Sequence, residues 1–168
     1  MEDRNDVMDP MNELAQTLQE TLHNDAQTRR RAEDRLHALT ANTPDAPAIT
    51  LALLNAPNTQ AHIRQAAAVF FKNLVKNHWD NEANNSIPQT LKTQLRDSLL
   101  SLFLNAPDAV QAQLCEAISL IAAHDFPNTW DSLLPILVAQ LDAAIGDAVP
   151  APARDYRKGR ALLLIAHA

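Results

Sequence analysis

Residues Ile63 to Trp79 read IRQAAAVFFKNLVKNHW, and the fold prediction starts from the spacing of the apolar residues in this stretch. At 100° per residue, those residues fall on one narrow stripe with two neighbours on its flanks, which is the pattern of a helix with one core-facing side. The stripe contains Ile63, Ala67, Phe70 and Leu74, and the flanks contain Ala66 and Phe71. The stretch therefore predicts an amphipathic helix.

The opposite side of this predicted helix is basic. No Asp or Glu occurs between Asp45 and Asp80, while Arg64, Lys72 and Lys76 lie inside that interval. The chain as a whole has a formal net charge of −6, so the stretch reverses the sign of the charge locally. An acidic partner is one interpretation of the lysines, and a lysine face that only meets water is the other. Spacing alone favours the second interpretation.

The composition of the whole chain also favours helices over strands. Hydrophobic residues make up 46% of the 168 residues but aromatic residues only 4%, and two glycines stand against ten prolines. A chain that is rich in Leu and Ala, with few aromatic or β-branched residues, is typical of helical proteins. The scarcity of glycine also argues against phosphate-binding loops and dinucleotide fingerprints, which need several glycines.

Nothing in the sequence indicates an active site. The single cysteine, Cys115, lies in an apolar helical pattern, which favours a small buried residue over a nucleophile. The six histidines are scattered without zinc-ligand spacing, and we expect neither a metal nor a cofactor. Asp125 follows His124, but helix capping explains this carboxylate better than acid–base catalysis does. We therefore predict that the protein is not an enzyme.

Charge and hydropathy narrow the class of partner. The net negative charge argues against nucleic-acid binding, because phosphate recognition needs a broad basic surface. The N-terminal residues MEDRNDVMDP lack the apolar run of a signal peptide, and no stretch approaches the roughly 18 apolar residues of a membrane span. The sequence predicts a soluble intracellular protein without membrane insertion, and its partner is expected to be another protein.

Prolines and polar turns divide the rest of the chain into further helical patterns. Asp9 predicts the N-cap of the first helix, Asp25 that of the second, and Thr59 that of the helix described above. The seventh helix is expected to open at Asp125 and to be kinked at Pro135. The expected helices span about 10–24, 25–42, 47–55, 60–79, 88–105, 108–124, 125–145 and 155–168.

The sequence Leu-Asn-Ala-Pro occurs twice, starting at Leu54 and at Leu104. Each copy lies between a leucine-rich helix and a second amphipathic helix, which indicates an internal repeat. Eight helices in four antiparallel pairs predict an all-α superhelix, a right-handed solenoid of HEAT-type pairs. This domain is expected over 9–168, after a disordered N-terminus at 1–8. Its last helix has no stop signal, which predicts that the chain is a C-terminally truncated fragment.

Three segments resemble elements of the importin-β (karyopherin) superfamily. IRQAAAVFFKNLVKNHW is similar to the family's pattern R-x-A-A-x-x-x-F-K-N-x-(I/V)-K-x-x-W. AISLIAAHDFPNTWDSLL resembles the D-F-P-x-x-W-x-x-L-L junction that follows, and RRRAEDRLHAL resembles the R-x-A-E-x-x-L element of the first repeat. The F-K-N-x-(I/V)-K motif and the terminal segment KGRALLLIAH are most similar to the exportins that return importin-α to the cytoplasm.

This resemblance implies a nuclear transport receptor whose N-terminal repeats bind the small GTPase Ran in its GTP form, on a concave surface lined by the second helix of each pair. Lys72, Asn73 and Lys76 match the family's K-N-x-x-K positions, so we expect them to contact Ran. Importin-α is the expected cargo of the full-length protein, which would shuttle between nucleus and cytoplasm through the nuclear pore. A HEAT-repeat scaffold unrelated to nuclear transport is the alternative.

The two tryptophans and the D-F-P triplet are expected to have a structural role. Trp79 matches the family's tryptophan, and packing at the helix end is favoured over contact with a partner. Asp125, Phe126, Pro127 and Trp130 are expected to form a staple at the junction between repeats rather than a binding site.

Overall fold

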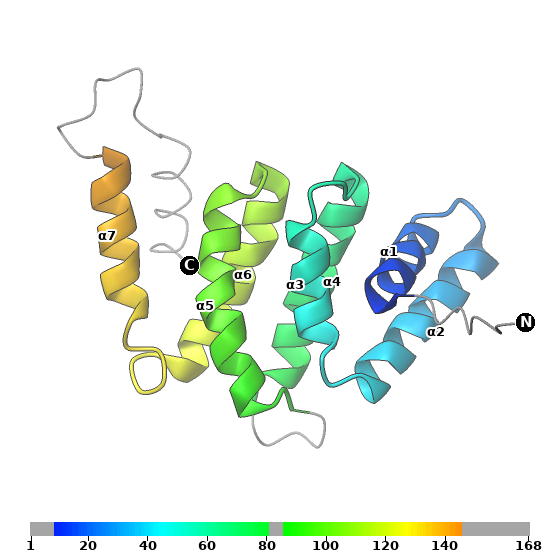
Figure 1. Ribbon diagram of the computed structural model, residues 1–168. Coiled ribbons are helices and arrows are strands. Elements are labelled where there is room, and N and C mark those ends of the chain that lie inside the picture. Colours follow the sequence, from blue (N-terminus) through cyan, green and yellow to red (C-terminus); the bar gives the residue numbers. More distant parts are fainter. Residues whose placement is uncertain (1–8, 81–85, 146–168) are drawn as a thin grey trace, which may run out of the picture.

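The computed structural model describes residues 9–80 and 86–145, and this part of the chain contains helices and no strands (Figure 1). The helices are α1 (Pro10–Thr21), α2 (Ala26–Asn42), α3 (Ala46–Asn55), α4 (Ala61–His78), α5 (Gln89–Asn105), α6 (Asp108–Asp125) and α7 (Leu133–Ile145). The all-α prediction is confirmed. The expected disorder at 1–8 and the expected last helix lie outside the described residues.

The helices form pairs that stack side by side. The pairs are α1 with α2, α3 with α4 and α5 with α6. The first pair contacts the second through α1, which meets both α3 and α4, and the second contacts the third through α3 and α5 and through α4 and α6. Figure 1 shows α3 and α5 in a front layer, with α4 and α6 behind them. Each pair leaves an apolar side that only the neighbouring pair covers. This arrangement confirms the predicted solenoid of HEAT-type pairs.

Side chains cap the first two helices as predicted. Asp9 accepts a hydrogen bond from the backbone N of Met11 at 3.3 Å, and Pro10 occupies the first turn of α1. Asp25 accepts a hydrogen bond from the backbone N of Thr28 at 2.7 Å, and this bond lowers the pKa of the Asp25 carboxyl. α1 ends at Thr21, however, three residues earlier than the spacing predicted.

The predicted cap at Thr59 is wrong. α4 begins at Ala61 after Gln60, whose side chain makes no capping hydrogen bond. The Thr59 hydroxyl instead donates to the carbonyl of Leu53 at 2.8 Å. That carbonyl lies in the last turn of α3, where the residue four positions on is Pro57, which has no N–H to donate. Thr59 therefore completes the preceding helix and not the following one.

The two Leu-Asn-Ala-Pro copies form turns of the same geometry. Ala56 and Ala106 are the C-caps of α3 and α5, and each has an extended backbone conformation. The Ala56 N–H donates to the carbonyl of Leu53, and the Ala106 N–H donates to that of Phe103, both at 3.3 Å. The proline that follows each alanine cannot continue the helix. The sequence repeat is thus a repeat of structure.

The expected start of the seventh helix is wrong. Asp125 is the last residue of α6, and its carbonyl accepts hydrogen bonds from the N–H groups of Thr129 and Trp130 in the following turn. Trp130 therefore precedes α7, which begins at Leu133. Pro135 gives no reason for the predicted kink, because it lies in the first turn of α7. Backbone N–H groups in a first turn have no acceptor within the helix, so a proline there removes no helical hydrogen bond.

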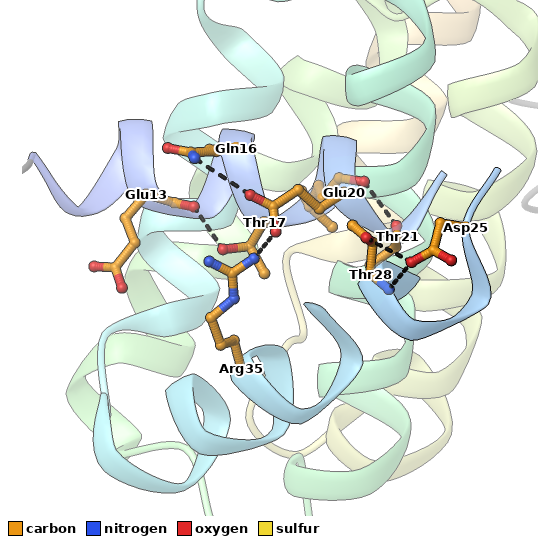
Figure 2. Close-up of polar contacts among 9 residues, drawn as sticks. Glu13, Gln16, Thr17, Glu20, Thr21, Asp25, Thr28 and Arg35 are labelled. Carbon is orange, nitrogen blue, oxygen red and sulfur yellow. Dashed lines mark hydrogen bonds and ion pairs between the residues drawn. The ribbon is translucent and has the colours of Figure 1, made fainter. Parts of the chain in front are cut away.

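Polar contacts tie the first pair together at its outer side (Figure 2). Arg35 of α2 forms an ion pair with Glu20 of α1, and Gln16 donates a hydrogen bond to the same carboxylate at 3.2 Å. Among the residues of α2, only Ala32 is fully buried, while Leu36 is half-buried. α2 therefore stays largely polar and exposed.

α4 has a wider buried face than its sequence predicted. Phe71 is fully buried, while Phe70, which was placed on the central stripe, is only half-buried. Ala68 and Val75 join the core as well. α4 contacts α3 and α1 on one side and α6 on the other, so two neighbours cover a surface that a single periodic stripe does not describe. The burial of Phe71 affects Lys72, the next residue, because it brings Lys72 close to the buried face of α4.

Cys115 is buried in α6 with a free thiol, in line with the prediction that it acts as a small apolar residue. Burial raises the pKa of this thiol, which disfavours the reactive thiolate.

Candidate functional site

The three residues expected to contact a partner lie on one stretch of α4 but have different surroundings. Asn73 and Lys76 are exposed. Lys72 is only 19% exposed, and its Nζ atom lies 3.3 Å from Oε2 of Glu116 on α6. Over residues 9–80 and 86–145, Lys76 has no such ion pair. Within the part of the chain that the structure describes, one lysine is therefore in an ion pair and the other is not.

The spacing placed both lysines opposite the apolar stripe of α4; Lys76 is exposed there, whereas Lys72 is held against α6. The spacing along a single helix cannot show what the neighbouring helix brings, and here α6 brings a carboxylate. Sequence reasoning missed Glu116, although it is the one acid of α6 between the two helix ends. A check of the acids on the neighbouring helix of the predicted stack would have found this candidate.

A groove runs between α2 and α4 on the side where Asn73 is exposed. Its first part has a volume of about 470 Å³ and includes the end of α1. A second hollow continues from it along the same two helices, and Leu36, Phe70 and Asn73 line both parts. Leu22 at the rim is 52% exposed and Val69 is 37% exposed. An apolar groove of this kind, beside exposed amide and ammonium groups, suits a protein segment with apolar and acidic side chains.

The residues expected at the repeat junction lie at the C-terminal end of α4, at the end of α6 and in the turn before α7. Trp79 is the C-cap of α4 and is 2% exposed. Lys92 of α5 donates a hydrogen bond to the Trp79 carbonyl, and its Nζ lies 5.3 Å from the centre of a Trp79 ring. Lys92 is itself 2% exposed, and burial lowers its pKa.

A second buried cation lies one turn further along α5. Arg96 Nη1 is 2.8 Å from Oδ2 of Asp125 and donates to the Thr129 hydroxyl at 3.1 Å, while Nη2 donates to the Thr93 hydroxyl at 3.1 Å. The Arg96 guanidinium thereby joins α5 to the end of α6 and to the turn that follows. Trp130 in that turn is buried at 3% exposure.

The other two residues of the triplet, Phe126 and Pro127, are exposed. Phe126 is 38% exposed, and the peptide bond between Phe126 and Pro127 is cis. The structure thus buries Trp130, joins the half-buried Asp125 to α5 through Arg96, and leaves the Phe126 side chain partly in solvent.

Sequence reasoning missed Lys92 and Arg96, although a signal was present. Together with Leu95 and Leu99 they occupy positions i, i+3, i+4 and i+7, which share one side of a helix. Two cations inside an apolar stripe must find acceptors when the stripe is buried. The Trp79 carbonyl and the Asp125 carboxylate are those acceptors.

Residues 9–80 and 86–145 also bear on two further classes of site, metal centres and membrane spans. In that part of the chain, no three His, Cys, Asp or Glu side chains gather so that they could hold a metal ion. None of the helices described there is both long and apolar enough to cross a membrane.

Comparison with known proteins gives matches along most of the chain. Residues 32–105 match the family model described as the importin-beta N-terminal domain. Exportin-2 of Oreochromis niloticus is 36% identical over 129 residues, which are 76% of this chain and 13% of that protein. Exportin-2 of Dictyostelium discoideum is 34% identical, covering 68% of this chain and 12% of that protein. The importin-alpha re-exporter of Schizosaccharomyces pombe is 39% identical, covering 49% and 9%.

Solved structures agree with the sequence matches. The exportin Cse1 in its cargo-free, cytoplasmic state has a TM-score of 0.74 and 27% identity, over 95% of this chain and 16% of that one. Kap95p, in a structure concerned with RanGDP, has a TM-score of 0.70 over 94% of this chain and 19% of that one, and at 20% identity it shows the fold alone. The chain spans 13% or less of the length of the three relatives named above. Because the family model includes α4 and the exportin-2 matches extend over most of the chain, the protein belongs to the importin-β (karyopherin) superfamily.

Proposed function

We propose that this chain is the N-terminal part of a nuclear transport receptor, which binds the GTP form of Ran and takes part in nucleocytoplasmic protein transport. The transport step is the export of importin-α. The observation that carries the proposal is the likeness to exportin-2 over 76% of the chain. The likeness to the importin-alpha re-exporter of S. pombe supports importin-α as the cargo. The role is stoichiometric rather than catalytic, and the receptor shuttles between nucleus and cytoplasm.

Ran binding is assigned to α4, and cargo binding to the full-length receptor. Kap95p shares this fold, and its binding makes the switch loops of RanGDP adopt the GTP-bound conformation. A receptor that fits this conformation better must prefer the GTP form, because a ligand shifts an equilibrium only through its differential affinity. Interfaces that hold a cargo protein draw on surface from many repeats, more than this chain supplies.

Asn73 and Lys76 are the main proposed contacts, and Lys72 is a secondary one. Both main contacts are exposed, and Asn73 also lines the apolar groove between α2 and α4. An amide can donate and accept hydrogen bonds, while the Lys76 ammonium attracts carboxylates on the partner. The groove supplies apolar area, which contributes most of the affinity of a protein interface, and the cation steers the encounter.

The proposal is tested by the nucleotide dependence of binding. The 168-residue chain is immobilised and presented with Ran loaded with a non-hydrolysable GTP analogue or with GDP, at matched concentrations and ionic strength. We expect the GTP-analogue form to be retained at least tenfold more strongly, as a fold-change in dissociation constant. Equal retention of the two forms, or retention of neither, would contradict the proposal.

A further inference from the structure

The ion pair between Lys72 and Glu116 links the proposed Ran-binding helix to its neighbour. The two charged atoms are 3.3 Å apart, one on α4 and one on α6. The lysine side chain is 19% exposed, and the glutamate side chain is 57% exposed. The lysine is therefore held against the neighbouring helix, while the carboxylate that holds it remains open to an incoming partner.

An acidic partner that approaches α4 meets two opposing charges at this position. It is attracted by the Lys72 ammonium and repelled by the Glu116 carboxylate, so the pair as a whole offers little net attraction. For the ammonium to bind the partner fully, it must leave Glu116 or share its hydrogen atoms with both carboxylates. Lys76 lies one turn away on α4 and has no ion pair among the described residues, so it needs no such exchange.

We infer that Glu116 acts as an internal competitor for Lys72 and thereby lowers the affinity of α4 for an acidic protein surface. The inference rests on the proposed function, since it names the residue that regulates the same site. Glu116 is an affinity-setting residue here and does not have to touch the partner. Its carboxylate occupies Lys72 in the free chain, which keeps binding weaker and more easily reversed than the two lysines alone would make it.

The test replaces Glu116 by the uncharged residue of the same shape. Glu116→Gln should tighten the binding of Ran, loaded with a non-hydrolysable GTP analogue, by about two- to fivefold at low ionic strength, the range expected for a partly exposed ion pair. The gain should shrink as salt is added, because screening weakens the competing attraction as well. Thermal unfolding, measured on the same samples, should be almost unchanged.

Two matched variants separate competition from a general charge effect. Asp97→Asn removes one negative charge from an exposed position on α5 and should leave Ran binding unchanged. In a Lys72→Gln background, Glu116→Gln should lose at least half of its effect, because a residue that acts through Lys72 has nothing to release once the lysine is gone.

The outcomes distinguish the inference from the proposal beneath it. If the unsubstituted chain retains the GTP-analogue form and Glu116→Gln binds equally or more weakly, the inference is overturned and Ran binding stands. An equal gain in the Asp97→Asn control, or an undiminished gain without Lys72, would also overturn it. If the unsubstituted chain retains Ran in neither nucleotide form, the proposed function fails and the inference fails with it.

Discussion

Lys72 and Lys92 each reach from their own helix to a neighbouring one, but they do so in different surroundings. Lys72 keeps 19% of its side chain in solvent and pairs with a carboxylate that is more than half exposed. Lys92 is 2% exposed, and it donates to a backbone carbonyl and lies over a Trp79 ring. The first lysine lies at the surface of the molecule, whereas the second is part of the interior.

The role of a basic residue on a helix therefore depends on the groups that the neighbouring helices place beside it. Water screens the ion pair between Lys72 and Glu116, so this pair contributes little to folding stability. The buried cations Lys92 and Arg96 have no water to replace a lost acceptor, so removal of an acceptor while the cation remains should destabilise the fold. Substitutions at the exposed pair and at the buried cations test this difference in stability.

Loss of the buried acceptor at the junction should have the largest effect. Asp125→Ala leaves the Arg96 guanidinium, whose side chain is 6% exposed, without its carboxylate. Removing one partner of a buried ion pair costs about 3 kcal/mol of unfolding free energy. Urea unfolding followed by circular dichroism measures this loss. A loss below about 1 kcal/mol would show that the junction behaves like the exposed pair.

Replacement of the buried lysine should have a smaller effect that depends on pH. Lys92→Met removes a buried charge and keeps a side chain of similar length, so the change at pH 7 should stay within about 1 kcal/mol. Burial lowers the pKa of Lys92 below its ordinary value of 10.5, so the unfolded chain binds more protons between the folded pKa and 10.5.

The sign of the pH effect follows from that proton difference. The unfolding free energy of the unsubstituted chain, relative to Lys92→Met, should rise as pH increases through this window and level off above 10.5. Because both chains retain Cys115, whose raised pKa acts in the opposite direction, the difference between them isolates the lysine. A flat difference between neutral pH and pH 10.5 would contradict the assignment of Lys92 to the interior.

Loss of the ion pair between Lys72 and Glu116 should have the smallest effect on folding stability. Lys72→Gln breaks the contact with Glu116, and we expect the unfolding free energy to fall by less than about 1 kcal/mol. Thermal or urea unfolding of this variant beside Asp125→Ala compares the two regions directly. If Lys72→Gln destabilises as much as Asp125→Ala, then Lys72 is a structural residue and its role as a partner contact is lost.

The sequence predicted features that depend on local periodicity and turn residues. The helices, the caps at Asp9 and Asp25, and the repeat of the Leu-Asn-Ala-Pro turns all follow from spacing and side-chain chemistry within one or two turns. The start of α7 was mistaken because Asp125 can cap a following helix or end a preceding one, and the sequence alone does not distinguish these.

Features that depend on two helices at once could not be predicted in the same way. The burial of Phe71 in place of Phe70, and the pairing of Lys72 with Glu116, both require the position of α6 beside α4. Arg96 could have been recognised as a buried cation from its place in an apolar stripe, but its acceptor lies 29 residues away. Long-range pairing of charges was therefore the part of the site that the sequence left open.

Charge reversal at Lys76 tests whether the exposed side of α4 binds the GTP form of Ran, as we propose. The matched control is Arg31→Glu, an equal charge change at an exposed position on α2 that lines a separate hollow with Thr28 and Asp34. We measure the dissociation constant of Ran loaded with a non-hydrolysable GTP analogue for the unsubstituted chain and both variants. We expect Lys76→Glu to weaken binding about tenfold or more, while Arg31→Glu should change it less than twofold. Equal affinities for all three chains, with unchanged unfolding, would contradict the proposal.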